Sequence, residues 1–334
     1  MRWPASLPES PVPVKAETLS LEEITITAEQ AGRRLDQALA EAMPGRTRAQ
    51  IQQWIGDGHV RIGGREVRKS QRVAGGERVE ISIPPPRELE DRPQPIPLEV
   101  VHEDETILVI NKPPGLVVHP GAGNRQGTLL NALLHHAPVL AQLPRAGIVH
   151  RLDKNTSGLL VIAKTEAARQ HLIAQLKERS MWREYITIAR GELITGRTIE
   201  APIGRHAHDR KRMAVTERGR PAISHVRVLK KYRGFTLLQV RLETGRTHQI
   251  RVHLAHVRHP VLGDPVYGGP LRFPVGASAA LRAVLQDFRR QALHAVKLGL
   301  THPESGIAMQ WAASVPRDMH ELMEALAAEV KRDG

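Results

Sequence analysis

The sequence predicts an α+β protein of two domains, the larger of which contains a largely antiparallel mixed sheet. Residues 30–83 alternate between helical and strand patterns over a length that suits a small domain. Residues 84–98 hold six prolines, which is typical of a semi-rigid extended linker. Residues 99–330 contain several strand-like runs with too few helices between them for a parallel βαβ array. A chain of 334 residues is long enough for one large core and a small accessory domain.

Residues 1–29 are expected to form a poorly ordered tail. Residues 1–22 carry four prolines and few large apolar side chains apart from Trp3 and three leucines. Such a segment buries too little apolar surface to offset the entropy lost when its backbone is ordered.

Residues 30–83 are expected to contain two short helices. Apolar residues recur at helical spacing from Leu35 to Ala42, and Pro44-Gly45 should end that helix. The second helix has Thr47 as its cap and should stop at Gly56-Asp57-Gly58.

A hairpin and a strand should complete the small domain. Val60 and Ile62 begin the hairpin, and Gly63-Gly64 is its predicted turn. Val79, Ile81 and Ile83 alternate with polar residues, as in a half-buried strand.

The larger domain should mix strands with one clear amphipathic helix. Ile107 to Ile110 is an apolar run that predicts a buried strand. Residues 166–179 carry apolar side chains at helical spacing. Three further strands are predicted at Tyr185 to Ala189, Val226 to Leu229 and Leu237 to Leu242.

Composition limits the functions that the protein can have. The net charge is +13, and residues 99–334 hold 34 Lys and Arg against 21 Asp and Glu, so the excess lies in the larger domain. A basic body indicates a polyanionic partner, most simply a nucleic acid.

The absence of cysteine excludes disulfides, thiolate catalysis and Cys-based zinc sites. No apolar run approaches the roughly 18 residues of a membrane span, and the first residues lack a signal-peptide core, so we expect a soluble cytoplasmic protein.

The stretch from His150 to Lys164 carries the clearest indication of chemistry. It is a polar turn with one carboxylate, Asp153, followed after Gly158 by a wholly apolar run that predicts a buried strand. Arg151 and Lys154 should keep this carboxylate ionised, as a nucleophile or base requires. From this stretch alone, Asp153 is either a reactive group or a structural acceptor in a turn that leads into a strand.

The same stretch, H-R-L-D-K-N-T-S-G-L-L-V-I-A-K, resembles the signature of the RluA-type pseudouridine synthases. Other stretches resemble that family in the same order along the chain, and the resemblance covers about residues 30–330. It implies the pseudouridine synthase fold. The further stretches are Arg183-Glu184-Tyr185, the run from Glu243 to His253 (E-T-G-R-T-H-Q-I-R-V-H), Gly263 to Gly268 (G-D-P-V-Y-G) and Leu293-His294-Ala295.

The resemblance implies roles for three catalytic residues. Isomerising uridine means breaking its N1–C1′ bond and joining C5 to C1′, and Asp153 would be the carboxylate that acts at C1′. Tyr185 would stack on the uracil and serve proton movement at C5. Arg251 would oppose the charge of Asp153, with Arg246 as the alternative partner.

Other basic residues are implied in RNA contacts. Arg151 would fill the space that the flipped uridine leaves, and His150 would order the loop. The order R-R-L-D-x-x-L, T-R-x-x-I-x-x-W-I, G-x-V-x-I-x-G in residues 33–64 resembles the S4 RNA-binding domain. Its implied RNA contacts, which could equally be an ordinary solvated face, are Arg33, Arg34, Arg46, Arg48 and Arg61. The cluster Arg205, Arg210, Lys211, Arg212 is a candidate phosphate-contact segment.

The implied function is isomerisation of specific uridines in large-subunit (23S) rRNA, with the helix 69 stem-loop as the target. The partner would be that rRNA, free or in an assembling 50S subunit, and the protein would be a monomer. The reaction is redox-neutral and requires no cofactor. We expect no metal either, because His253, His256 and His259 lack a carboxylate that would complete a metal set. The alternatives are a sister enzyme for other 23S uridines, a non-catalytic rRNA-binding assembly factor, and a glycosidase that releases free uracil.

Overall fold

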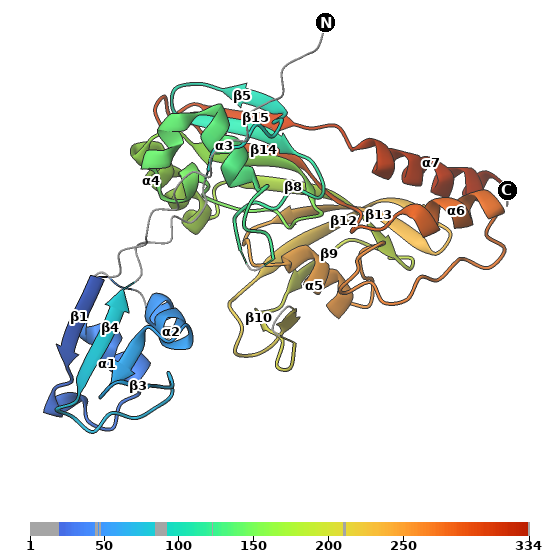
Figure 1. The fold of residues 1–334 in the computed structure, drawn as a ribbon. Coiled ribbons are helices and arrows are strands. Elements are labelled where there is room, and N and C mark those ends of the chain that lie inside the picture. The colour runs from blue at the N-terminus through green and yellow to red at the C-terminus, as the bar shows by residue number, and fades with distance from the viewer. Residues whose placement is uncertain are drawn as a thin grey trace, which may run out of the picture. The chain divides into compact units, whose positions relative to one another are not determined.

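The computed structural model describes residues 20–43, 46, 48–83, 92–121, 123–209 and 212–332 (Figure 1). The chain forms two compact units, which divide between residues 89 and 90. Each unit has its own hydrophobic core. None of the helices in the described ranges has the length and apolarity needed to cross a bilayer.

The smaller unit is a four-stranded antiparallel sheet with two helices packed against it (Figure 1). The strand order is β1-β4-β2-β3, and apolar side chains of both helices meet those of β4 in the core. These elements confirm the two helices, the hairpin and the strand predicted for this region, whereas Pro44-Gly45 and Thr47 lie outside the described residues. The elements are β1 (Ser20–Thr25), η1 (Ala28–Gln30), α1 (Leu35–Ala42), α2 (Arg48–Gly56), β2 (Val60–Ile62), β3 (Arg65–Glu66) and β4 (Arg78–Ile83).

The expectation of a poorly ordered tail is wrong for residues 20–29, while residues 1–19 lie outside the described residues. Strand β1 begins at Ser20 and pairs with β4 along its whole length, from Ser20 opposite Ile83 to Thr25 opposite Arg78. Ile26, which follows β1, is completely buried in the core of the small unit. Because the partner strand lies far away in the sequence, the composition of residues 1–29 did not reveal this pairing.

The larger unit is built on a sheet of nine described strands, in the order β5-β6-β7-β14-β8-β13-β12-β9 with β15 beside β14. Strands β7 and β14 pair in parallel, whereas the other described pairs are antiparallel. The predicted α+β class with a largely antiparallel mixed sheet is therefore confirmed. The strands are β5 (Val100–Glu103), β6 (Ile107–Lys112), β7 (Ser157–Ala163), β8 (Trp182–Arg190), β9 (Arg197–Glu200), β12 (Ile223–Tyr232), β13 (Phe235–Leu242), β14 (Leu293–Thr301) and β15 (Ala308–Ala312).

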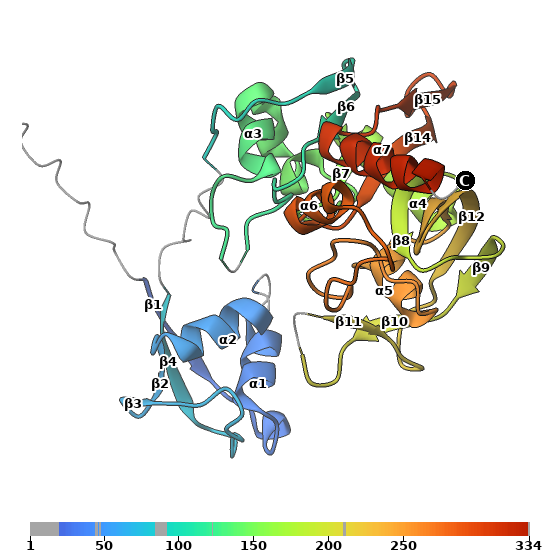
Figure 2. The ribbon, with the colours of Figure 1, turned by 90° about the vertical axis from the view of Figure 1, so that its right-hand side faces the viewer.

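Helices cover both faces of the centre of this sheet (Figures 1 and 2). Helix α4 (Glu166–Glu178) packs on one face against β7 and β14. On the other face, the core takes apolar residues from α3 (Leu129–His136), α5 (Gln249–His256), α6 (Ala279–Asp287) and α7 (Arg317–Arg332). Strands β6 and β7 contribute residues to the apolar cores on both faces of the larger sheet. This explains why their sequences are apolar without alternation.

Several shorter elements complete the larger unit. Two 3-10 helices, η2 (Pro138–Gln142) and η3 (Pro144–Gly147), follow α3. Strands β10 (Ile203–Arg205) and β11 (Met213–Val215) form a separate two-stranded sheet whose second strand contacts α5 (Figure 2).

The second half of the proline-rich segment belongs to the larger unit. The N–H of Gln94 donates to the carbonyl of Asn131 in α3 at 3.0 Å, and the Asn131 amide donates to the carbonyl of Arg92 at 3.0 Å. Residues 84–91 lie outside the described residues. The segment from 92 to 98 is thus held against α3, rather than forming a linker as expected.

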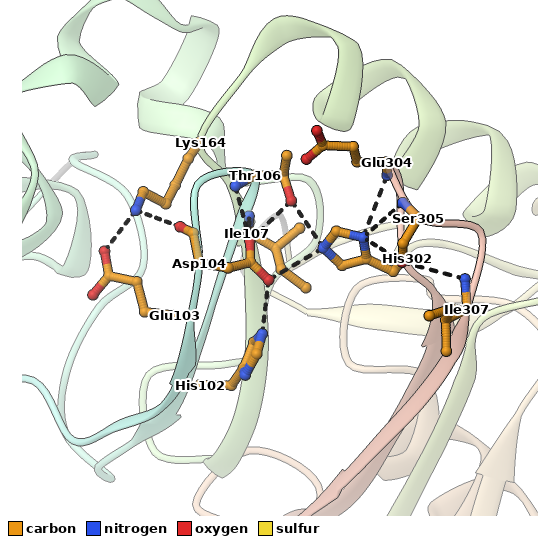
Figure 3. Close-up of polar contacts among 10 residues, drawn as sticks. All are labelled: His102, Glu103, Asp104, Thr106, Ile107, Lys164, His302, Glu304, Ser305 and Ile307. Atoms are coloured by element: carbon orange, nitrogen blue, oxygen red, sulfur yellow. Dashed lines mark hydrogen bonds and ion pairs between the residues drawn. The ribbon is translucent and has the colours of Figure 1, made fainter.

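A polar network holds one end of the larger sheet together (Figure 3). In the turn between β5 and β6, Asp104 accepts the backbone N–H of Thr106 at 2.8 Å. His302, after β14, places Nε2 at 3.1 Å from Asp104 and 2.9 Å from Thr106, while its Nδ1 accepts the N–H of Ser305. Lys164, directly after β7, donates to the carbonyl of Asp104. Three segments that are distant in the sequence are thereby joined at the edge of the core.

Candidate active site

Asp153 lies in the loop that leads into β7, the fully buried strand at the centre of the sheet. At the start of β7, Gly158 has a φ of +114°, and a Cβ there would lie 2.3 Å from the carbonyl oxygen of Ala295 in β14. Only glycine allows β7 and β14 to approach so closely. The carbonyl of Asp153 accepts the N–H of Thr156 at 3.0 Å, which closes a turn. The carboxylate of Asp153 is thus presented by a rigid part of the fold, with its side chain 17% exposed.

Arg251 of α5 joins two carboxylates. Its Nη1 donates to Asp153 Oδ2 at 2.9 Å, while Nε and Nη2 donate to the two oxygens of Asp264 at 2.6 and 2.9 Å. Burial would lower the pKa of Arg251, but Asp264 and Asp153 raise it above its usual value. For Asp264 the effect of burial has the opposite sign and would raise the pKa. Arg251 and the N–H groups of Val266 and Tyr267 outweigh it, so the pKa of Asp264 lies below its usual value. Arg251 is therefore a permanently charged side chain that faces Asp153 in a fixed orientation.

A cavity of about 540 Å³ opens beside Asp153. Its size suits a small-molecule or nucleoside-sized group. Asp153, Tyr185 and Arg251 all line it, and so do His150, Arg151 and Arg246, so the predicted catalytic and base-flipping residues lie around one cavity. Most of the other charged groups in the lining are cations, which favours an anionic ligand. They are Arg145, Lys177, Arg179, Arg183 and Arg220.

Tyr185 presents a buried hydroxyphenyl ring to the cavity from β8. It pairs with Val240 of β13 on one side and with Ala295 of β14 on the other, so the backbone at this position is fixed. Burial raises the pKa of the Tyr185 hydroxyl, Asp153 raises it further, and Arg183 opposes both. The hydroxyl therefore carries its proton at neutral pH.

The three remaining predicted residues of this domain differ in what they contact. His150 Nε2 accepts the backbone N–H of Val161 at 3.2 Å, which ties the loop to β7. Burial, with a further effect of Arg183, lowers the pKa of His150 to about 3. Arg246 donates to the carbonyl of Pro221 at 3.1 Å, so Arg251 is the arginine that contacts Asp153. Arg151 is exposed at the cavity.

Lys112, which the sequence did not single out, lies fully buried beneath the Asp153 loop. Its Nζ donates to the carbonyls of Pro113, Leu116 and Lys154 at 2.7, 3.0 and 3.1 Å. Lys154 directly follows Asp153, so this ammonium group holds the loop in place. The signal in the sequence is a lysine at the end of the apolar run from Ile107, followed by Pro-Pro-Gly.

Replacing Lys112 by Met should remove part of the pH dependence of stability. Burial lowers the pKa of Lys112 from 10.5 to about 7, despite the opposing charge of Asp153. Between these values the unfolded chain binds a proton that the folded chain lacks, so the free energy of unfolding rises with pH. The variant should lack this rise. Urea denaturation between about pH 7 and pH 10 measures it, with exposed Lys154→Met as the control. A constant difference between wild type and Lys112→Met across this range would contradict the prediction.

Asp264, His248 and Tyr267 are further residues of this region to which the sequence assigned no role. Asp264 and Tyr267 belong to the G-D-P-V-Y-G stretch, and His248 lies in T-H-Q just before α5. Both stretches belong to the family pattern seen in the sequence. What their side chains contact depends on how α5 packs against the loop after it, and that packing has no local signal.

Two of the three histidines considered as metal ligands, His253 and His259, have other partners. His253 is completely buried, with Nδ1 at 2.9 Å from the Ser224 hydroxyl and Nε2 at 2.9 Å from the carbonyl of Ala201. His259 Nδ1 lies 3.0 Å from the carbonyl of Arg190. Within the described ranges, no three His, Asp or Glu side chains are grouped as a metal site.

Three of the predicted RNA-contacting arginines of the small unit form ion pairs within it. Arg34 and Arg48 donate to the fully buried carboxylate of Asp36 at 3.0 and 2.9 Å. Burial would raise the pKa of Asp36, but these two arginines and a side-chain amide lower it to about 2. Arg33 pairs with Glu41. Arg34 and Arg48 therefore stabilise the small unit, and each remains nearly half exposed.

The other two arginines predicted to contact RNA from the small unit are exposed. Arg46 precedes α2 and lies 5.7 Å from the centre of the Trp54 ring, and Arg61 projects from β2. In the larger unit, Arg205 ends β10 and Arg212 precedes β11, while Arg210 and Lys211 lie outside the described residues.

The geometry of the larger unit defines what this site can do. It offers an oriented carboxylate, a permanent cation behind it and a buried aromatic ring, all beside a cavity with a basic lining. Such a carboxylate can stabilise or trap the positive charge that develops when a glycosidic bond breaks. The basic lining suits a substrate that is part of a polyanion.

This fold and this site define an enzyme that acts on a nucleoside within RNA, and the family comparison agrees. The RNA pseudouridylate synthase family matches residues 106–256, and the S4 domain matches residues 33–79. The chain belongs to the RNA pseudouridine synthase family, which confirms the resemblance seen in the sequence.

The particular relatives are bacterial rRNA enzymes. The chain is 52% identical over 306 residues to ribosomal large subunit pseudouridine synthase D of Escherichia coli strain K12, covering 91% of this chain and 94% of that one. It is 51% identical over 308 residues to the enzyme of the same name from Yersinia pestis, covering 92% and 95%. Among solved structures, human RNA pseudouridylate synthase domain containing 4 is similar, with a TM-score of 0.56, 25% identity, and coverage of 69% of this chain and 93% of that one.

Proposed function

We propose that this protein has the function for which the relatives named pseudouridine synthase D are named. It isomerises uridines of 23S rRNA to pseudouridine, in the helix 69 stem-loop. The observation that carries the proposal is the carboxylate of Asp153, held at 2.9 Å by Arg251 beside a cationic cavity. The names of the relatives support the large-subunit rRNA as the substrate.

Asp153 acts at C1′ of the target uridine. Its Oδ2 is engaged by Arg251, so Oδ1 is the oxygen directed to the substrate. Breaking the N1–C1′ bond leaves positive charge on the sugar and the bonding electron pair on the uracil. Asp153 either attacks C1′ or removes a proton to form a glycal, and both courses require its ionised form. Joining C5 to C1′ then releases the C5 proton, while N1 gains one.

The cavity accepts a uridine that has left its stack. A base inside folded RNA is out of reach of Asp153, so it must be flipped out, and Arg151 fills the vacated space. Tyr185 stacks on the extruded uracil, and its protonated hydroxyl serves proton movement at C5. His150 holds the loop, and Arg246 contacts the RNA at the rim.

The small unit supplies affinity for RNA that depends strongly on salt and little on sequence. Arg33, Arg34, Arg46, Arg48 and Arg61 contribute to it, the exposed Arg46 and Arg61 most directly. The RNA affinity lost on removal of residues 1–83 measures this contribution. We further propose a cytoplasmic monomer that requires no cofactor, because the reaction exchanges one bond for another without oxidation or group transfer.

The deciding experiment is tritium release from 23S rRNA labelled at C5 of uridine. We expect release from full-length rRNA and none from a transcript that lacks the helix 69 stem-loop. Release from the shortened transcript would show that the enzyme modifies uridines outside the helix 69 stem-loop. Tight binding without release would instead support a non-catalytic assembly factor. Free uracil among the products would indicate a glycosidase.

A further inference from the structure

We propose that His248 is a catalytic residue that donates a hydrogen bond to the departing uracil, and that Tyr267 positions it. The inference rests on the proposed function, in which Asp153 acts at C1′ of a uridine in rRNA. It concerns a contact between the enzyme and the base, whereas Asp153 and Arg251 act at the sugar.

His248 is held in an unusual conformation at the cavity. It lies directly before α5 with a φ of +57°, a left-handed conformation that non-glycine residues adopt rarely. Its side chain is 20% exposed and lines the same cavity as Asp153. Such a backbone persists where the surrounding structure holds it, and it commonly marks a functional position.

The hydrogen bonds of Tyr267 decide which ring nitrogen of His248 carries the proton. The Tyr267 hydroxyl oxygen accepts the backbone N–H of Met213 in β11 at 2.9 Å, and it lies 2.8 Å from His248 Nδ1. The oxygen could accept a second hydrogen bond, but only donation of the hydroxyl proton to Nδ1 gives that proton an acceptor among the contacts of Tyr267, so we assign the bond in this direction. His248 is thereby held as the tautomer with the proton on Nε2.

The Nε2–H group faces the reacting oxygen of Asp153. Nε2 lies 3.9 Å from Asp153 Oδ1, the oxygen that Arg251 leaves open. This separation is too long for a hydrogen bond, so the donor is available to a group that enters the gap. When C1′ of the substrate meets Oδ1, N1 of uracil is one bond from C1′ and O2 is three bonds from it, so both atoms lie close to the gap. They are the atoms that take the electron pair of the broken bond.

Burial keeps this imidazole neutral. It lowers the pKa of His248, and Arg251 and Arg151 lower it further, against the opposing charges of Asp153 and Asp264. A neutral N–H donor stabilises the negative charge that develops on the uracil without neutralising the carboxylate of Asp153 beforehand.

Tyr267 is anchored from several directions. Its ring lies 5.1 Å from the guanidinium of Arg251 and 5.4 Å from that of Arg212. Its backbone N–H donates to Asp264 at 3.1 Å. The hydroxyl therefore connects β11 to His248, and displacement of the β10–β11 sheet would disturb the imidazole.

Kinetics separate a catalytic role from a structural one. His248→Leu should lower kcat about 100-fold with KM changed less than about threefold, since the lost donor acts as the bond breaks. His248→Gln, whose amide can donate, should recover part of the loss. Tyr267→Phe should lower kcat about tenfold, because the ring is then no longer held in one tautomer. Tyr232→Phe, a buried tyrosine of β12, is the matched control and should leave kcat unchanged.

Nuclear magnetic resonance of ¹⁵N-histidine-labelled protein tests the same inference without substrate. His248 signals, assigned by their loss in His248→Gln, should show the proton on Nε2 in the full chain and a mixture of tautomers in Tyr267→Phe. A proton on Nδ1 in the wild type would overturn the proposal, and so would a kcat of His248→Leu close to that of the wild type. If the wild type releases no tritium from 23S rRNA, the proposed substrate fails, whereas the tautomer measurement still decides the role of Tyr267.

Discussion

Asp153→Asn should abolish tritium release, with a loss of at least about 10⁴-fold in the single-turnover rate, while RNA affinity stays unchanged. The amide has nearly the same shape as the carboxylate and still offers an oxygen to Arg251 Nη1, which lies 2.9 Å from Oδ2 in the wild type. It is uncharged, however, so it neither traps an electron-deficient C1′ nor removes a proton. The measurement is the single-turnover rate at saturating enzyme.

Asp153→Glu is the matched control for this prediction. It keeps the charge but moves the oxygens by about one carbon–carbon bond, and a displacement of about 1 Å costs roughly 100-fold in rate. We therefore expect weak activity in Asp153→Glu and none in Asp153→Asn. Loss of RNA affinity in Asp153→Asn would indicate that the residue binds RNA, and measurable turnover would assign the chemistry to another group.

Arg251→Met should damage both catalysis and folding. The side chains of Arg251 and Asp264 are 5% and 0% exposed, so the substitution leaves two carboxylates in the interior without their shared cation. Removing one member of such a buried cluster costs about 3–5 kcal/mol of folding free energy. The remaining carboxylates should also favour their protonated forms, so the turnover rate should fall about 1,000-fold. Urea denaturation and single-turnover kinetics measure the two effects.

Two conservative variants separate charge from geometry. Arg251→Lys keeps the cation but offers no planar fork that reaches both carboxylates, so most of the stability should return while the rate stays low. Asp264→Asn leaves the pairing of Arg251 with Asp153 but weakens the contact that orients the guanidinium. A normal rate in Arg251→Lys would show that the charge alone is required and would contradict the importance of the fixed orientation.

The sequence by itself determined the local elements and singled out Asp153 as the candidate catalytic carboxylate. Helical spacing predicted α1 and α4, and apolar runs predicted β6 and β7. The stretch around Asp153 is contiguous, so its polar turn, glycine and buried strand could be read from adjacent residues. The basic excess in residues 99–334 likewise required no coordinates.

Only the tertiary structure decided how these parts combine. Strand β1 belongs to the small unit because it pairs with β4, about sixty residues further along the chain. Asp153 and Arg251 meet across 98 positions of sequence. The structure shows what Lys112 does, through the three carbonyls around its Nζ, and it shows the contact between His248 and the Tyr267 hydroxyl. Hydrogen bonds and charge effects depend on distances of a few ångströms in space, whereas periodicity in a sequence reports only neighbours along the chain.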